Sequence, residues 1–451
     1  MQMKLTFKIV LLMAVSVTLS AAVLAQELRR SGFLGIVATP LTDEARKQLG
    51  SGETGILVKS VVDGGSAKDV GIKANDIITQ VNDHKVIDVG DFLQVVKTLR
   101  AGDVAKVSLL RGTERLSKEM SVKPRPFESA PDVETLYKAV SVNGSLRRVI
   151  VTKPKDNARH PAVLYINGVG CFSQESLDLS STDTKLLYGL TRAGFVTMRV
   201  EKSGMGDSLG PPCLSPEVDM QSEIGGYIAG MRALKGYPFV DDGNVFLVGL
   251  SVGGVEAPLI AQQVPVRGLV VINTVAKSFM EYLSDTRRRQ NLLRHTPYDE
   301  LEGRLKLNER CNHRLLIELQ TPEQLLKDIP DCADYIAYPA PYTFMQQWAA
   351  LNLAEEWKKI DAPTLVVYGS SDYISTIADD PYLMEIINGF HSGRATLKAI
   401  PNMDHYMLKA SSMEESMKRT AAAPIEFEPL VLESIKTWLQ QQTKPSVSAN
   451  R

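Results

Sequence analysis

The segment 245–263 constrains the fold of this chain more than any other. It opens with four consecutive apolar residues, passes through Gly249-Leu250-Ser251-Val252-Gly253, and ends in a helix-forming run. A strand without polar side chains is typical of a parallel sheet that helices cover on both faces. Small residues two positions before and after Ser251 leave room for strand and helix to pack. The segment therefore predicts a strand, a tight turn and a helix within an α/β domain.

The same alternation extends over residues 133–442. We expect strands at 139–142, 148–152, 162–166, 196–199, 245–248, 268–272, 364–368 and 395–400, and helices at 183–193, 218–234, 253–263, 381–387 and 429–441. The stretch 275–348 breaks the pattern, because it is long, charged and helical. We expect it to form a cap over the site, and we expect a flexible tail at 443–451.

Two serines fit the pattern G-x-S-x-G. Ser251 directly follows the apolar strand and precedes the helix, which is the setting that a nucleophilic serine requires. Ser208 lies in Gly206-Asp207-Ser208-Leu209-Gly210, but Pro211-Pro212 prevents a helix from starting there in that register. Its Gly-Asp-Ser-Leu string also resembles another lipase family, but this chain lacks that family's Asp-x-x-His pair near the C-terminus. We therefore predict that Ser251 is the nucleophile.

A serine nucleophile needs a base and a carboxylate that orients it. Asp372 follows the apolar strand 364–368, and His405 follows the strand 395–400. Both therefore lie at strand carboxyl ends, where open α/β sheets bind their ligands. A helix N-cap is the alternative role for Asp372, but the order serine, acid, histidine favours a catalytic role. Asp404 adjoins His405 and is a poor orienter, because adjacent side chains point apart.

Together these residues resemble the α/β-hydrolase superfamily, above all its serine-aminopeptidase-like and acyl-esterase branches. The resemblance implies an α/β-hydrolase fold with a mostly parallel sheet, helices on both faces and a helical cap insertion. It also implies two oxyanion donors, the N–H of Val252 and an N–H from the loop Asn167-Gly168-Val169-Gly170-Cys171, where we choose Val169 first and Gly170 second. Asn167 stands where the family usually has His. The loop 201–208 matches a further family feature, with Glu201 in place of Asp, and we expect it to be structural.

Residues 30–123 form a separate unit, with expected strands at 56–58, 76–81, 105–110 and 114–122 and helices at 67–70 and 91–99. The unit resembles a bacterial PDZ domain in Gly32-Phe33-Leu34-Gly35-Ile36, in Gly64-Gly65-Ser66-Ala67-Lys68 and in the stretch 70–78, although Asn75 replaces the usual Gly. The resemblance implies that N–H groups around Phe33, Leu34 and Gly35 receive a peptide carboxylate, and that Ile36 and the helix 91–99 line the side-chain pocket. Docking within the chain or dimer formation is the alternative. A Pro-rich linker is expected at 124–132.

The first 25 residues are typical of a signal peptide. Lys4 and Lys8 precede a largely apolar run at 9–23, and small residues at 23–25 offer a cleavage site before Gln26. An uncleaved membrane anchor is the alternative. No other stretch approaches the ~18 apolar residues that span a bilayer. We expect a periplasmic or secreted protein without stable membrane insertion after cleavage.

An exported protein with an even number of cysteines can form disulfides. Three pairings exist, and sequence proximity favours Cys311–Cys332, which leaves Cys171–Cys213. None of the spacings resembles a zinc site, so we expect no metal and no cofactor. The net charge of −1 gives no electrostatic case for binding nucleic acid.

These patterns favour an exported serine hydrolase, and first a carboxylic ester hydrolase that forms an acyl-enzyme on a small or medium acyl ester. A serine peptidase of the aminopeptidase-like kind, whose PDZ domain recruits peptide C-termini, is the second hypothesis. A PDZ scaffold with an inactive hydrolase domain is the third. The motifs do not separate the first two, because one such site can cut esters and amides.

Overall fold

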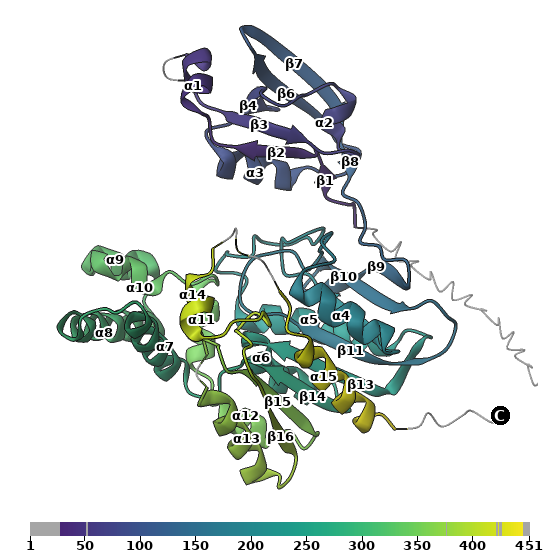
Figure 1. The fold of residues 1–451 in the computed structure, drawn as a ribbon, viewed down its shortest axis with the longest axis vertical. Coiled ribbons are helices and arrows are strands. Elements are labelled where there is room, and N and C mark those ends of the chain that lie inside the picture. Colours follow the sequence, from purple (N-terminus) through teal and green to yellow (C-terminus); the bar gives the residue numbers. More distant parts are fainter. Residues whose placement is uncertain (1–27, 51–52, 376, 421–422, 424–425, 445–451) are drawn as a thin grey trace, which may run out of the picture.

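A computed structural model of the chain describes residues 28–50, 53–375, 377–420, 423 and 426–444. Figure 1 shows a small β-rich domain above a larger α/β domain. The predicted signal peptide at 1–25 lies outside the described residues, as do positions 445–451 of the predicted tail. Within the described part, no helix is both long and apolar enough to cross a membrane.

The small domain is built on an antiparallel sheet. Its strands follow the order β2-β3-β4-β6-β7, with bounds β2 (Ile36–Thr39), β3 (Ile56–Val61), β4 (Ile77–Val81), β6 (Val104–Arg111) and β7 (Glu114–Ser121). The remaining elements are α1 (Asp43–Leu49), α2 (Ser66–Asp69), β5 (His84–Lys85) and α3 (Val89–Thr98). Ala67 of α2 and Phe92 of α3 belong to the core of the domain. β1 (Gly32–Phe33) pairs with β8 (Lys123–Pro124), which brings the two ends of the domain together.

The large domain is built on a mostly parallel sheet. Among the described residues it has eight strands in the order β16-β15-β14-β13-β11-β12-β10-β9. Their bounds are β9 (Val133–Val142), β10 (Ser145–Pro154), β11 (His160–Ile166), β12 (Val196–Val200), β13 (Val240–Leu250), β14 (Gly268–Ile272), β15 (Thr364–Gly369) and β16 (Ala395–Ile400). β10 pairs antiparallel with β9 on one side and with β12 on the other. The remaining pairs, β12-β11-β13-β14-β15-β16 in sheet order, are all parallel. Every strand expected from the sequence is present.

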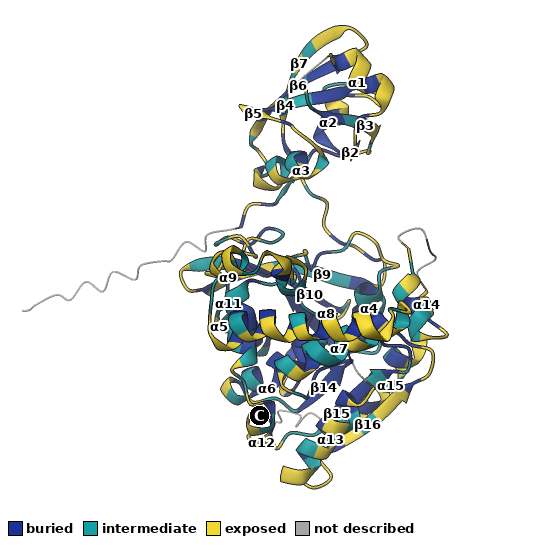
Figure 2. Cartoon of the chain, turned by 90° about the vertical axis from the view of Figure 1, so that its left-hand side faces the viewer, coloured by how far each residue is buried: buried dark blue, intermediate teal, exposed yellow. Residues whose placement is uncertain are grey.

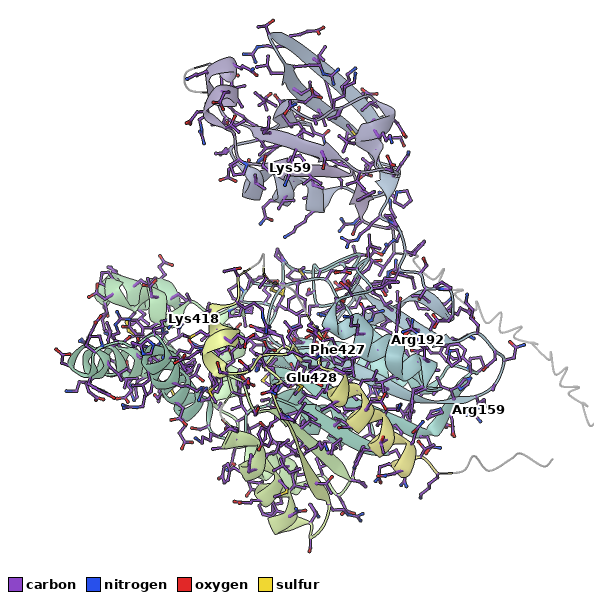
Figure 3. All side chains as sticks on the ribbon, viewed as in Figure 1. Lys59, Arg159, Arg192, Lys418, Phe427 and Glu428 are labelled. Carbon is purple, nitrogen blue, oxygen red and sulfur yellow. A yellow bond between two sulfur atoms is a disulfide. The ribbon has the colours of Figure 1, made fainter. Side chains whose placement is uncertain are left out.

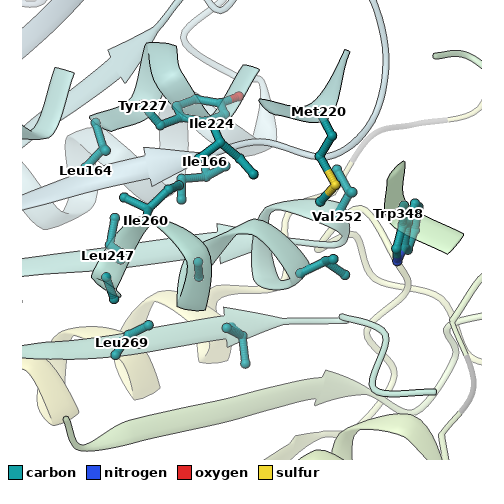
Figure 4. Packing of buried hydrophobic residues seen from close by; sticks show 14 of the residues in the cluster. Leu164, Ile166, Met220, Ile224, Tyr227, Leu247, Val252, Ile260, Leu269 and Trp348 are labelled. Carbon is teal, nitrogen blue, oxygen red and sulfur yellow. The ribbon is translucent and has the colours of Figure 1, made fainter. Parts of the chain in front are cut away.

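This sheet separates two hydrophobic cores. In β13, Val245 and Leu247 belong to one core, and Phe246 and Val248 belong to the other. The first core contains α5 (Met220–Lys235) and α6 (Val252–Gln263), as Figure 4 shows, and the second contains α4 (Thr182–Arg192) and α15 (Pro429–Gln442). Because helices cover both faces, every position of this strand segment carries an apolar side chain. The run of apolar residues thus has its physical reason in two-sided burial.

A helical cap lies between β14 and β15. Its helices are α7 (Phe279–Leu293), α8 (Tyr298–Asn312), α9 (Pro322–Asp328), α10 (Ala333–Ile336) and α11 (Tyr342–Ala349). On α8, Leu301, Leu305 and Asn308 are buried at helical spacing, so the opposite face is exposed (Figure 2). A disulfide joins Cys311 to Cys332, which is the pairing that proximity favoured. α12 (Leu353–Lys358), α13 (Asp379–Phe390) and α14 (Met413–Lys418) complete the domain.

Candidate active site

Ser251 occupies a strained turn between β13 and α6. Its φ of 55° and ψ of −120° lie outside the regions that non-glycine residues ordinarily adopt. Both flanking glycines are required by close packing. A Cβ on Gly249 would lie 2.4 Å from the carbonyl oxygen of Gly253, and a Cβ on Gly253 would lie 2.3 Å from that of Ile166. The G-x-S-x-G pattern therefore reflects a crossing too tight for side chains.

Asp372 and His405 are brought together from two neighbouring strand ends. The Nδ1 atom of His405 lies 2.7 Å from Oδ2 of Asp372, and both side chains are buried. An ionised carboxylate only accepts hydrogen bonds, so this contact favours the tautomer with the ring hydrogen on Nδ1, which leaves the Nε2 lone pair free to take a proton. Asp372 also accepts the N–H groups of Ile374 at 2.7 Å and Ser375 at 3.1 Å, and the hydroxyl of Ser375. These bonds fix the carboxylate against the ring.

The loop after β16 holds His405 through contacts with the start of the last helix. The N–H of Glu428 donates to the carbonyl oxygen of Met407 at 2.9 Å. Leu408 forms an antiparallel bridge with Phe427, which is itself buried in the second core. Figure 3 labels Phe427 and Glu428. The position of His405 thus depends on a segment more than twenty residues later in the chain.

Asn273 ties the acid and histidine loops together, and sequence reasoning missed it. Its Nδ2 donates to the carbonyl oxygens of Asp404 and His405, each at 3.1 Å, and its Oδ1 accepts the N–H of Gly369 at 2.8 Å. The residue follows the apolar strand β14 directly and has a φ of 48°. A polar residue at the end of a wholly apolar strand was the available signal.

The carboxylate of Asp404 is engaged elsewhere. Its Oδ2 accepts the hydroxyl of Ser416 at 2.9 Å and the guanidinium of Arg419 at 2.5 Å. Its Oδ1 accepts the N–H of Leu408 at 2.9 Å. The acid next to His405 therefore stabilises its own loop, and Asp372 is the acid that contacts the imidazole.

A cavity of about 600 Å³ lies beneath the cap. Ser251 and His405 line its floor, and the cap contributes Tyr282, Arg287, Arg294, Tyr335 and Tyr338. The lining is mixed apolar and polar, which suits a small organic molecule with one or two polar groups. Within the described residues, no group of three or more His, Cys, Asp or Glu side chains could hold a metal ion.

The loop after β11 passes directly beside the nucleophile. A Cβ on Gly168 would lie 3.4 Å from Cβ of Ser251. Val169 lines the same cavity, and among the described residues the N–H groups of Val169 and Val252 donate to no acceptor. Asn167 secures the loop, since its Nδ2 donates to Asp183 at 2.7 Å and its Oδ1 accepts the N–H of Gly168 at 2.7 Å. The two predicted oxyanion donors are thus available for a ligand.

The second disulfide joins Cys171, in that loop, to Cys213. This is the pairing that remained once Cys311–Cys332 was chosen. It links the loop beside the nucleophile to the segment that follows the second G-x-S-x-G match. Ser208 in that match is buried, its hydroxyl accepts the N–H of Arg148 at 2.9 Å, and it does not line the active-site cavity. The second match is therefore a structural turn.

A second cavity, of about 580 Å³, lies along the small domain. The four residues predicted to bind a peptide line it (Phe33, Leu34, Gly35 and Ile36), and α3 adds Phe92, Leu93 and Val96. Among the described residues, the N–H groups of Leu34 and Gly35 donate to no acceptor. The large domain supplies the opposite wall, which includes Phe172. Phe172 also lines the active-site cavity, so the two cavities share a side chain that sequence reasoning missed.

The fold and this site define a hydrolase of the α/β type that carries an N-terminal PDZ domain. Residues 163–423, more than half of the chain, match the model of the alpha/beta hydrolase family, and residues 32–122 match that of the PDZ domain. The chain therefore belongs to the alpha/beta hydrolase family. Both resemblances expected from the motifs are confirmed.

Relatives divide between the two domains. The "Esterase EstD" of Thermotoga maritima is 23% identical over 361 residues, which cover 78% of this chain and 77% of that protein. A "Probable periplasmic serine endoprotease DegP-like" of Brucella suis is 36% identical over 81 residues, and the one of Pseudomonas putida is 27% identical over 118 residues. These matches cover 16% and 24% of the two relatives. Among solved structures, Est1E of Butyrivibrio proteoclasticus with bound ferulic acid is 17% identical, covers 68% of this chain and 98% of that one, and has a TM-score of 0.45.

Proposed function

We propose that this protein is an exported serine hydrolase that cleaves carboxylic esters with Ser251, His405 and Asp372. One observation carries the proposal. Ser251 lies at a strained strand–helix turn and shares one cavity with His405, whose Nδ1 is held by Asp372. A nucleophile, a base and an orienting carboxylate are the parts that acyl transfer needs.

In this mechanism Ser251 Oγ attacks the carbonyl carbon of the ester, and its proton passes to Nε2 of His405. The N–H groups of Val169 and Val252 stabilise the oxyanion that forms. The carbon–oxygen bond to the alcohol then breaks, and the alcohol leaves with the proton from His405. Water repeats the sequence on the acyl-enzyme: it gives a proton to His405, releases the acid and restores Ser251.

Sequence coverage favours ester over amide substrates. The relative named an esterase matches most of this chain, whereas those named endoproteases match only over about a fifth to a quarter of it. The peptidase hypothesis keeps one specific support, because the PDZ cavity and the active-site cavity share Phe172. The strained backbone at Ser251 argues against an inactive scaffold, because such strain is found mainly at functional sites.

The PDZ domain, in our proposal, binds the C-terminus of a peptide. Unpaired backbone N–H groups at Leu34 and Gly35 would receive the carboxylate, and Ile36 with α3 would contain the last side chain. We also propose that the domains span 30–123 and 133–442, with a linker at 124–132 and the cap at 275–348.

Export is a further part of the proposal. The DegP-like relatives are named periplasmic, and the two disulfides suit an oxidising compartment. Intact-mass analysis of the protein from a periplasmic fraction should give a chain that begins at Gln26. A chain that begins at Met1 in the membrane fraction would instead support the anchor.

A probe and a substrate panel test the enzyme. A fluorophosphonate should label the wild type and Ser208→Ala but not Ser251→Ala, and no labelling of the wild type would support the scaffold hypothesis. Matched 4-nitrophenyl esters and 4-nitroanilides should then show higher kcat/KM for the esters. Faster turnover of every amide would favour the peptidase.

A further inference from the structure

Lys202 contacts the back of the loop that carries Val169. The residue follows β12, its side chain is only 3% exposed, and its Nζ donates to the carbonyl oxygen of Gly168 at 3.2 Å. Gly168 and Val169 line the active-site cavity, and Lys202 does not. The ammonium therefore holds this backbone from outside the cavity.

Because the peptide unit is planar, the contact with the Gly168 carbonyl also fixes the direction of the Val169 N–H. Among the described residues no peptide bond is cis. In a planar trans unit, the carbonyl of one residue and the N–H of the next point in opposite directions. Once Lys202, which lies outside the cavity, fixes the Gly168 carbonyl, the N–H of Val169 must point away from Lys202.

Two carboxyl groups on neighbouring helices surround Lys202. Glu223 on α5 places Oε1 2.7 Å from its Nζ, and Glu256 on α6 is fully buried. Neither oxygen of Glu256 accepts a hydrogen bond from the described residues. Burial, and then the charge of Glu223, raise the pKa of Glu256 well above its usual value. Lys202 and Glu223 form an ion pair in the interior, and the charge of the buried Arg147 also acts on Glu223.

The preceding residue holds the other end of the same loop. Oε2 of Glu201 accepts the N–H of Gln174 at 2.9 Å, and Oε1 accepts the hydroxyl of Ser173. Residues 201 and 202 therefore attach to both ends of the loop 168–174. The loop 201–208 matched a family motif in the sequence, and its first two residues hold the loop 168–174 in place.

We propose that Lys202 is a positioning residue for the oxyanion hole, and that it acts by fixing the Gly168–Val169 peptide plane. The proposal rests on the proposed function, because it assumes acyl transfer at Ser251. It assigns the pair Lys202–Glu223 to transition-state stabilisation and not to substrate binding. Loss of the pair should therefore lower kcat and leave KM unchanged.

The test removes the ion pair as a unit, so that neither Lys202 nor Glu223 is left without the other. Lys202→Met/Glu223→Gln is compared with Lys153→Met/Glu134→Gln, which removes a buried lysine with its partner at 2.9 Å on β10 and β9, away from the loop. We expect kcat on 4-nitrophenyl butyrate to fall about 10- to 100-fold, less than or equal to the loss of a whole oxyanion donor. KM should stay within about threefold, and Ki for a tetrahedral boronate should rise by the same factor as kcat falls. The control pair should change neither value.

An active wild type whose kcat is unchanged in the Lys202/Glu223 variant would overturn this role and leave the proposed function standing. A wild type inactive on every ester and unlabelled by fluorophosphonate would overturn both. Because the variant could fail to fold, a crystal structure of the wild-type phosphonate adduct gives a second measurement. We expect the N–H of Val169 to bind the phosphonyl oxygen while Lys202 binds the Gly168 carbonyl. A Gly168 carbonyl turned toward the adduct would contradict the proposal.

Discussion

Asp207 holds the guanidinium of Arg30 at 2.7 Å, across 177 positions of sequence. Arg30 begins the small domain, and Asp207 belongs to the loop of the large domain that contains the second G-x-S-x-G match. The same carboxylate accepts the N–H of Ser31 at 2.8 Å and the side chain of Arg148 at 2.9 Å. Both partners are buried, so this contact joins the two domains through a charged, desolvated cluster.

We expect Asp207→Asn to destabilise the protein by about 3 kcal/mol, because buried Arg148 loses its counter-charge and Arg30 keeps only Glu175. The urea midpoint measured by circular dichroism checks this. Asp103→Asn is the matched control, since its partner Arg29 is largely exposed and such pairs contribute about 1 kcal/mol or less. Equal losses of unfolding free energy in the two variants would show that the inter-domain cluster stabilises the protein no more than an exposed ion pair does.

Asp372→Asn should lower kcat on a nitrophenyl ester by about 10³- to 10⁴-fold, because an amide can donate to Nδ1 and favour the wrong ring tautomer. KM should change little. The neighbouring Asp404→Asn should instead lower the thermal midpoint and keep kcat of the folded fraction within about tenfold, since Asp404 contacts Arg419 and Ser416 and not the imidazole. If Asp404→Asn lowered kcat and Asp372→Asn lowered only the thermal midpoint, Asp404 would be the acid that orients His405.

The carboxyl of Glu201 should make stability depend on pH. Burial raises its pKa from 4.5 to about 7 in the folded protein. The folded state then keeps a proton that the unfolded chain releases, so its stabilising contribution is full below pH 4.5 and is lost as pH rises through 7. Relative to Glu201→Gln, the wild type should lose roughly 3 kcal/mol of unfolding free energy between pH 4.5 and pH 8. Parallel curves for the two proteins would refute the shift.

Phe172→Ala should weaken two functions together, because the ring lines both cavities. We expect Kd for a peptide with an apolar C-terminal residue to rise about 5- to 10-fold, and KM for an aryl ester to rise as well. Fluorescence anisotropy and initial rates measure the two values. Phe390→Ala, an exposed phenylalanine on α13 that lines neither cavity, is the control. A change in only one of the two values would show that the cavities are independent in function.

The sequence determined the parts of this protein that depend on local pattern. Apolar runs predicted the central strands of the large sheet, such as β13 and β14, since two-sided burial makes consecutive residues apolar. The crossing at Gly249 and Gly253 required glycine and marked the turn at Ser251. The order of Ser251, Asp372 and His405 along the chain indicated three strand ends at one edge of a sheet, and the structure brings Asp372 and His405 into contact there.

Only the tertiary structure decided which residues support that edge. Asn273 and Lys202 donate hydrogen bonds to backbone carbonyls of residues far away in the chain, and such contacts leave no periodic signal in sequence. Phe172 belongs to two cavities because two domains meet at its loop. Side-chain chemistry and strand order are local properties that a sequence records, whereas the direction of a peptide plane and the meeting of two surfaces depend on packing across the whole chain.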